Sequence, residues 1–295
     1  MHAIAAALLC ALLPWAAVAA ASTHDRAVAL APHIVELVFA AGAGHTLVGV
    51  ARGSNYPDTA KSIQGVGDGT RLSAEHVLAL RPDLVIGWQP APLRTLVPLL
   101  AAQHIDVVYS DPQRLQDIGP DIERLGALLG TAPQARRASM SLAARLDALR
   151  TRYRDATPVR VFIQVSQEPL YSVGESSIVS DALRICGAVN VMGQTGIVAP
   201  RTSVESVLAT QPDAILAGTL DAADRQALVK FWRSRGWPAS VDETDGRIIT
   251  LNADTLYRAT PRLIDATEAL CGQLEGVRAM MRDTPKRMDK PNHDR

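Results

Sequence analysis

Two carboxylates, Glu75 and Glu205, occupy the same position in two copies of one sequence motif. The first copy, residues 71–88, reads RLSAEHVLALRPDLVIGW, and the second, residues 201–218, reads RTSVESVLATQPDAILAG. Both glutamates are expected in the first turn of a helix, where an acidic side chain complements the helix dipole. The alternative is a pair of equivalent carboxylates on matched lobes that face a two-fold symmetric partner. The spacing alone does not distinguish these interpretations.

The motifs of several enzyme classes are absent from the sequence. It contains neither a Walker-type phosphate loop nor HExxH, and Gly174-Glu-Ser-Ser-Ile178 departs from G-x-S-x-G at its last position. No histidine has metal-ligand spacing with cysteines or carboxylates. His33, directly after Pro32 at the end of a predicted strand, is interpreted as an ordinary surface or hydrogen-bonded histidine. The sequence therefore disfavours an enzyme and predicts no metal site.

Four aromatic residues lie near the ends of predicted strands, although aromatic residues make up only 4% of the chain. They are Tyr56, Trp88, Tyr171 and Tyr257. A cleft lined by such side chains suits a large flat or apolar ligand, with a few polar groups that fix its orientation. The alternative is that each ring packs inside a hydrophobic core.

The repeated motif predicts the elements that carry these residues. Ser73 and Ser203 are expected to cap short helices, because a serine hydroxyl accepts a hydrogen bond from a free backbone N–H. Pro82 and Pro212 end the helices, since the residue before proline disfavours the helical region. The apolar runs that follow are typical of buried parallel strands. We therefore expect an α/β fold with two similar lobes, each a mainly parallel sheet covered by helices.

The rest of the chain supports this alternation of strands and helices. Further strands are expected at residues 27–30, 47–50, 105–109, 159–165 and 247–251, and further helices at 34–41, 93–103, 115–129, 178–186, 224–232 and 262–282. Residues 134–154 contain no helix breaker and predict one long rigid helix of roughly 30 Å. We divide the chain into an N-terminal lobe (25–130), a connecting helix (131–156) and a C-terminal lobe (157–282).

The two ends of the chain differ from its body. Residues 3–21 are rich in alanine and leucine and end in small-x-small patterns, so we expect a cleaved signal peptide at residues 1–21 and export to the periplasm. The alternative is a retained transmembrane anchor. Residues 283–295 are charged and poor in apolar side chains, which predicts a disordered tail.

Composition sets further limits. The net charge is zero, without a basic patch for nucleic acid, and 295 residues suffice for two domains. Removal of the signal peptide leaves Cys186 and Cys271, an even pair that predicts a disulfide in an exported chain, with two buried thiols as the alternative. We expect a monomer without a cofactor.

Several segments resemble the periplasmic substrate-binding proteins of ABC importers for cobalamin, haem and siderophores, and within that group the B12-binding members most. These segments are the export signal, the long helix, residues 73–88, VALAP at 28–32 with Glu36, Tyr56-Pro57, ICGAVN at 185–190, RATPR at 258–262 and Leu270-Cys271. The resemblance covers about residues 26–274. It implies the class III fold of two lobes joined by a rigid helix.

The resemblance also assigns roles to particular residues. It supports the disulfide, and it implies that Glu75 and Glu205 face arginines of a dimeric permease in the inner membrane. The expected ligand-binding residues are Pro32, Tyr56, Trp88, Tyr171, Asp254, Tyr257 and Arg258. Well-known members of the family carry aromatic residues at the positions that are Gly53, Gly69 and Ala199 in this chain.

The expected function is therefore binding of cobalamin or a related corrinoid between the lobes and its delivery to an ABC importer. A first alternative is a haem or ferric-siderophore binding protein, for which a tyrosine such as Tyr56 would serve as a metal ligand. A second alternative is a periplasmic enzyme or sensor domain on the same fold.

Overall fold

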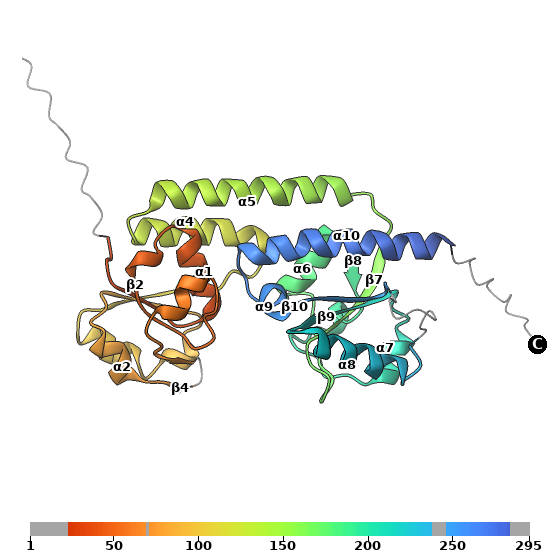
Figure 1. Cartoon of the computed structure of the whole chain (residues 1–295), viewed down its shortest axis with the longest axis horizontal. Helices are drawn as coiled ribbons and strands as arrows, with labels where there is room; N and C mark the ends of the chain where they lie inside the picture. The colour runs from red at the N-terminus through yellow and green to blue at the C-terminus, as the bar shows by residue number, and fades with distance from the viewer. Residues whose placement is uncertain (1–22, 69–70, 238–245, 284–295) are drawn as a thin grey trace, which may run out of the picture.

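The computed structural model describes residues 23–68, 71–237 and 246–283, so the predicted signal peptide, Gly69 and residues 284–295 lie outside the described residues. Two four-stranded parallel sheets form the centres of two lobes that lie side by side (Figure 1). The first sheet has the order β2-β1-β5-β6 and the second has the order β10-β9-β7-β8. The first consists of β1 (Ala27–Ala29), β2 (Leu47–Val50), β5 (Leu84–Gly87) and β6 (Asp106–Tyr109). The second consists of β7 (Val159–Gln164), β8 (Ala188–Asn190), β9 (Ala214–Thr219) and β10 (Ile248–Asn252).

The two sheets have the same topology, as the repeated motif predicts. If β1 is matched with β7 and β5 with β9, then β2 corresponds to β8 and β6 to β10, and the strand orders coincide. The motif forms α2 (Ala74–Ala79) before β5 and α7 (Val204–Ala209) before β9. Ser73 Oγ accepts from the backbone N–H of His76 at 3.3 Å, and Ser203 Oγ accepts from that of Ser206 at 3.2 Å. The predicted serine caps are therefore confirmed.

In each lobe, an arginine and an aspartate hold the repeated motif against the central strand. Asp83 accepts from the backbone N–H of Arg26 at 3.2 Å, and the Arg26 guanidinium donates to a carbonyl at the end of α2 at 2.6 Å. In the second lobe Asp213 accepts from the N–H of Arg160 at 2.8 Å, and Arg160 donates to a carbonyl at the end of α7 at 2.7 Å. Because these bonds position β5 and β9, they also position the loops that follow them.

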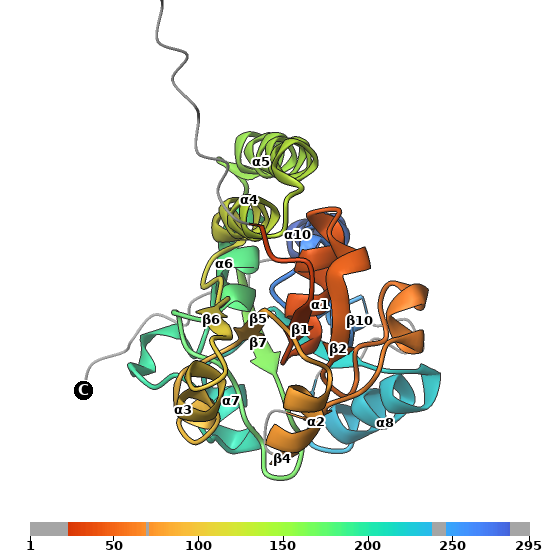
Figure 2. The ribbon, with the colours of Figure 1, turned by 90° about the vertical axis from the view of Figure 1, so that its left-hand side faces the viewer.

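Long helices cross above the lobes (Figures 1 and 2). Helix α4 (Ile118–Leu128) and α5 (Ala132–Tyr153) pack together, and α5 extends over both sheets, parallel to α10 (Pro261–Asp283). Arg145 of α5 donates to Asp265 at 2.6 Å and to Glu268 at 2.8 Å on α10. The long helix α5 thus packs against both α4 and α10 where it crosses the two lobes.

The remaining helices cover the sheets. They are α1 (Pro32–Ala40), α3 (Val97–Ala101), α6 (Ile178–Ile185), α8 (Ala222–Arg233) and α9 (Ala253–Leu256). The predicted helix at 93–103 is wrong in extent, because a separate 3-10 turn at Ala91–Leu93 precedes α3 and Pro98 lies in the first turn of α3. The hairpin of β3 (Gly67–Asp68) with β4 (Arg71–Leu72), strand β8 and helix α9 were not predicted, since each is too short to show a period.

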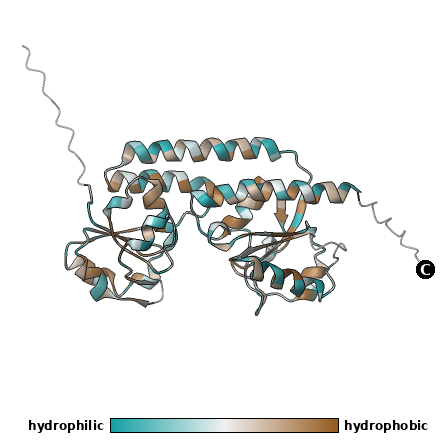
Figure 3. Ribbon diagram, in the orientation of Figure 1, coloured by the Kyte–Doolittle hydropathy of each residue, from teal (hydrophilic) through white to brown (hydrophobic). Residues whose placement is uncertain are grey.

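One hydrophobic core is continuous between the lobes and the long helices. It includes Ile34 of α1, Ile122 of α4, Leu146 of α5, Ile163 of β7 and Leu263 of α10, all of them buried. Figure 3 shows apolar strands inside both lobes and polar residues along the outer side of α5. A shared core of this kind resists relative movement of the lobes, because packed side chains have few alternative arrangements.

The predicted disulfide is confirmed. Cys186, at the end of α6, is bonded to Cys271 of α10, and both residues are fully buried. No helix among the described residues is long and apolar enough to span a bilayer.

Replacement of Cys186 and Cys271 by alanine should lower the free energy of unfolding by about 2–4 kcal/mol, because the bond closes a loop across a sequence separation of 85 residues. Denaturant unfolding of the mature protein measures the loss. Dithiothreitol should destabilise the wild type to a similar degree and leave the double variant unchanged. Equal stability of the oxidised wild type and the double variant would contradict this assignment.

Candidate ligand-binding site

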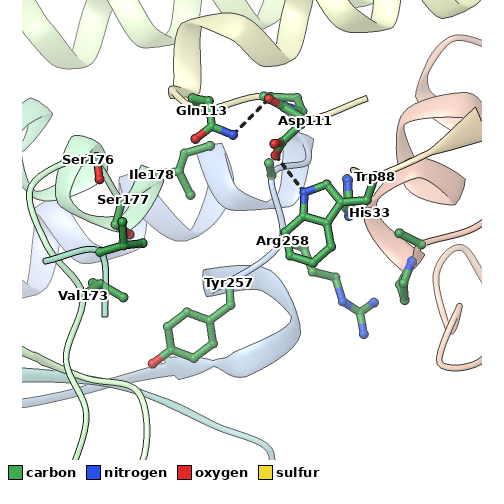
Figure 4. Close-up of a pocket in the computed structure, with 15 residues that line it drawn as sticks. His33, Trp88, Asp111, Gln113, Val173, Ser176, Ser177, Ile178, Tyr257 and Arg258 are labelled. Carbon is green, nitrogen blue, oxygen red and sulfur yellow. Dashed lines mark hydrogen bonds between the residues drawn. The ribbon is translucent and has the colours of Figure 1, made fainter. Parts of the chain in front are cut away.

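A cleft of about 480 Å³ lies between the lobes. The chain reaches it mainly where parallel strands end. Pro32 comes after β1, Trp88 after β5 and Asp111 after β6, while Tyr257 follows α9, the short helix after β10. The carboxyl ends of parallel strands are the usual position of ligand sites in open α/β sheets. The lining residues are Ala31, Pro32, His33, Trp88, Asp111, Pro112, Gln113, Val173, Ser176, Ser177, Ile178, Val198, Tyr257, Arg258 and Ala259 (Figure 4).

The wall of the first lobe is built around the indole of Trp88. Its Nε1–H donates to Asp111 Oδ1 at 2.7 Å, and its ring meets the edge of His33 with the ring centroids 5.6 Å apart. Trp88 nevertheless remains 51% exposed. The hydrogen bond orients the indole, so a flat apolar surface is presented to the cleft.

His33 is a buried neutral donor in this wall. Its Nε2 lies 3.2 Å from the carbonyl oxygen of Ser110, to which the N–H form donates. Burial lowers the pKa of His33 below its usual value, with smaller opposing effects from the Ser110 bond and from nearby carboxylates. The imidazole is therefore uncharged at neutral pH. The described residues contain no cluster of three or more potential metal-binding side chains.

The opposite wall comes from the second lobe. The Tyr257 hydroxyl donates to the carbonyl of Gln164 at 2.9 Å and accepts from the N–H of Gly218 at 3.0 Å, so the ring is fixed against β7 and β9. Burial raises the pKa of Tyr257, which keeps the phenol protonated at neutral pH. Val198, 73% exposed, extends the apolar surface. Ser177 caps α6 by accepting from the N–H of Val179 at 3.2 Å.

A charge cluster links the lobes beside this cleft. Glu36 of α1 is almost fully buried, with a side chain 2% exposed. It accepts from Arg258 at 3.2 Å and from Arg262 at 2.8 Å, both of the second lobe. Arg258 also donates to Asp254 at 2.5 Å. The bond to Glu36 is the main cause of the raised pKa of Arg262, with burial acting in the opposite direction.

The loop after β2 completes the cluster from the side of the first lobe. Asn55 accepts from Arg258 at 2.8 Å and donates to Asp254 at 2.7 Å, and the Gly53 carbonyl accepts from Arg258 at 3.3 Å. Gly53 adopts φ +82°, a conformation that side-chain-bearing residues rarely adopt. The guanidinium of Arg262 lies 4.2 Å from the centre of the Tyr56 ring.

The structure brings four of the seven predicted ligand-binding residues to the cleft: Pro32, Trp88, Tyr257 and Arg258. Asp254 instead supports Arg258, and the Tyr56 ring packs against Arg262. Tyr171 pairs through its backbone with Ser166 and Arg201 and does not line the cleft.

Sequence reasoning missed several lining residues. Asp111 and Gln113 follow the predicted strand at 105–109, so the strand-end rule that selected Trp88 could have identified them. The sequence predicts only a surface or hydrogen-bonded histidine at position 33. It is hydrogen-bonded, yet it also lines the cleft. The start of α6, residues 176–178, carried no chemical signal beyond two serines.

Glu75 and Glu205 lie away from the cleft. Each is exposed in the first turn of its helix, α2 or α7, and both helices lie on the side of the molecule opposite α5 (Figure 2). Hydrogen bonds to its own backbone N–H and to Ser203 lower the pKa of Glu205, so it is ionised at neutral pH.

Comparisons with known proteins agree with this architecture. The chain is 31% identical to a vitamin B12-binding protein of Yersinia pestis over 274 residues, which cover 92% of this chain and 93% of the relative. It superposes on the periplasmic vitamin B12 binding protein of Vibrio cholerae with a TM-score of 0.76 and 32% identity, covering 86% of this chain and 98% of the other.

A haem-binding protein is also similar. The periplasmic haem-binding protein RhuT of Roseiflexus sp. RS-1 superposes with a TM-score of 0.71 and 27% identity, covering 86% of this chain and 98% of that protein. The model of the periplasmic binding protein family matches residues 28–253. With its two matched lobes, its layer of long helices and its inter-lobe cleft, this chain belongs to the periplasmic binding protein family.

Proposed function

We propose that this protein binds cobalamin or a related corrinoid between its lobes and delivers it to an ABC importer. The observation that carries the proposal is the cleft itself, which has the fixed rings of Trp88 and Tyr257 on opposite walls. Two aromatic surfaces held by hydrogen bonds suit a broad, partly apolar macrocycle. The similarity to B12-binding proteins of Yersinia pestis and Vibrio cholerae selects a corrinoid among such ligands.

The ligand would enter a preformed site. The Glu36 cluster and the shared core hold the lobes in one arrangement, so binding requires little closure. We propose that residues 25–130 and 157–282 act as the two ligand-holding lobes, with residues 131–156 maintaining their separation. We also propose export to the periplasm with removal of residues 1–21, because the relatives of known structure are periplasmic proteins.

Haem is the second candidate ligand, because two haem-binding proteins of known structure are 27% and 28% identical to this chain. The contacts of Tyr56 weaken it. Its ring packs under Arg262 and does not line the cleft, so its hydroxyl would have to be reoriented to bind iron.

Titration calorimetry of the mature protein with cyanocobalamin and hemin in parallel tests this proposal. We expect tight binding of cyanocobalamin with a 1:1 stoichiometry. A Trp88→Ala variant should bind it at least tenfold more weakly, because Trp88 is 51% exposed at the cleft and the variant loses this aromatic surface. Asp147→Asn, on the outer helix α5, serves as the control with unchanged affinity.

The opposite result would change the ligand assigned to this protein but not its family. Binding of hemin without any affinity for corrinoids would reject the corrinoid proposal. In that case an iron–phenolate absorption band that disappears in Tyr56→Phe would identify Tyr56 as the iron ligand. The phenylalanine retains the ring that packs under Arg262, so loss of the band would report on the hydroxyl alone.

We further propose that Glu75 and Glu205 contact arginines of the permease. They occupy equivalent points of the two lobes, they are exposed, and they are remote from the cleft residues. Two equivalent carboxylates on one side of the molecule match the two-fold symmetry of a dimeric partner.

The double variant Glu75→Arg with Glu205→Arg should abolish uptake of labelled cobalamin by cells, since like charges would then face each other at the interface. Its affinity for cyanocobalamin should equal that of the wild type. Asp147→Arg with Asp155→Arg reverses the same amount of charge near α5 and should retain uptake. Loss of ligand affinity in a folded glutamate variant would place these residues in the binding site instead.

A further inference from the structure

The charges that line the cleft are unequally compensated. Among the described lining residues, only Asp111 and Arg258 carry a formal charge at neutral pH, since His33 is neutral. The guanidinium of Arg258 pairs with Asp254 and Glu36, and Glu36 also pairs with Arg262. The positive charges of two arginines thus balance the negative charges of two carboxylates. Asp111 has no cationic partner within the described chain, so its charge is left over.

The position of Asp111 makes its carboxylate available to a ligand. Oδ1 accepts one hydrogen bond, from the Trp88 indole, and the amide of Gln113 donates to the backbone carbonyl of Asp111 and not to its side chain (Figure 4). An ionised carboxylate has about four acceptor sites, so the described residues leave most of its capacity unused. These sites lie at the edge of the surface on which a flat ligand would stack.

The partial positive charges at nearby helix N-termini compensate the charge of Asp111 only in part. Helices α1 and α6 both begin at the cleft, and each N-terminus carries about half a positive charge. However, α1 starts with Pro32, which has no N–H, and Ser177 already accepts from the N–H of Val179 in α6. The free donors at both helix starts are therefore reduced, whereas Asp111 uses one acceptor site, for the Trp88 indole.

We propose that Asp111 is the specificity residue by which this cleft selects tetrapyrroles with amide side chains over those with carboxylate side chains. The inference rests on the proposed corrinoid function and adds the chemical basis of its selectivity. The corrin periphery carries primary amides, whose N–H groups can donate to Asp111. Haem carries propionates, which are anionic acceptors. A carboxylate facing them can form no hydrogen bond and repels their charge.

The expected size of this selectivity is moderate. The cleft is open and Asp111 is solvent-accessible, so water screens much of the repulsion between two carboxylates. We expect about a tenfold difference in affinity when a single ligand amide next to Asp111 becomes a carboxylate, which corresponds to 1.4 kcal/mol.

The test uses cyanocobalamin and its monocarboxylic acids, in which one peripheral amide has been hydrolysed. These ligands differ by one group and share the macrocycle, so the comparison isolates the amide from the ring. Wild type should bind at least one acid about tenfold more weakly than the parent compound. Asp111→Asn, which keeps an oxygen for the Trp88 indole, should reduce this ratio to threefold or less and should raise the affinity for hemin.

Two further variants act as controls. Asp111→Glu keeps the charge and should retain discrimination against the acid, whereas Asp147→Asn removes a charge on the distant helix α5 and should leave the ratio unchanged. If wild type binds the parent and all acids equally, or if Asp111→Asn keeps the full ratio, the role of Asp111 is refuted while the corrinoid function stands. If wild type does not bind cyanocobalamin at all, the proposed function itself fails.

Discussion

The rest of the site depends on one interaction, the pairing of the buried Glu36 carboxylate with two arginines of the other lobe. A carboxylate that is 2% exposed is stable in its charged form only when cations replace its lost hydration, and Arg258 and Arg262 of the other lobe provide them. Removal of one partner from such a buried pair typically costs about 3–5 kcal/mol, so separation of the lobes is strongly disfavoured. The same contacts hold Arg258 at the edge of the cleft in one conformation. One ionic cluster therefore sets both the distance between the lobes and the position of a lining residue.

The helical layer acts in the same direction as this cluster. The ion pairs of Arg145 with Asp265 and Glu268 join α5 to α10 on the outside, while the shared core joins α4, α5 and α10 to both sheets. The outer pairs are partly exposed and contribute little individually, so the core carries most of the stiffness. A ligand of such a protein is recognised by a preformed surface rather than by closure. Specificity must then come from the fixed side chains of the two walls, which is why an uncompensated charge at Asp111 has consequences.

Much of the fold could be predicted from the sequence, because its signals are local. The serine caps, the prolines at 82 and 212 and the apolar runs after them identify matched helix–strand units, and the structure contains both. The site was less predictable. Trp88, Tyr257 and Arg258 line the cleft, but Tyr56 and Tyr171 do not, since ring direction is set by tertiary partners such as Arg262. Glu36 pairs with Arg258 and Arg262, which lie 222 and 226 positions away, and neither charge sign nor spacing in the sequence reveals such a pairing.

The two faces for which we propose functions differ in symmetry. On the side that carries α2 and α7, the repeated motif preserves a serine cap followed by an exposed glutamate in each lobe. At the cleft the equivalent strand ends have diverged. β5 is followed by Trp88, held by Asp111, whereas the matching position of the repeat in β9 is Gly218, whose N–H helps to hold the ring of Tyr257 after α9. A dimeric permease presents the same surface twice, while a corrinoid has chemically distinct edges and no such symmetry. The repeat is thus kept where we propose a symmetric partner and is lost where we propose a ligand without symmetry, which favours assigning the glutamates to docking and the divergent residues to ligand recognition.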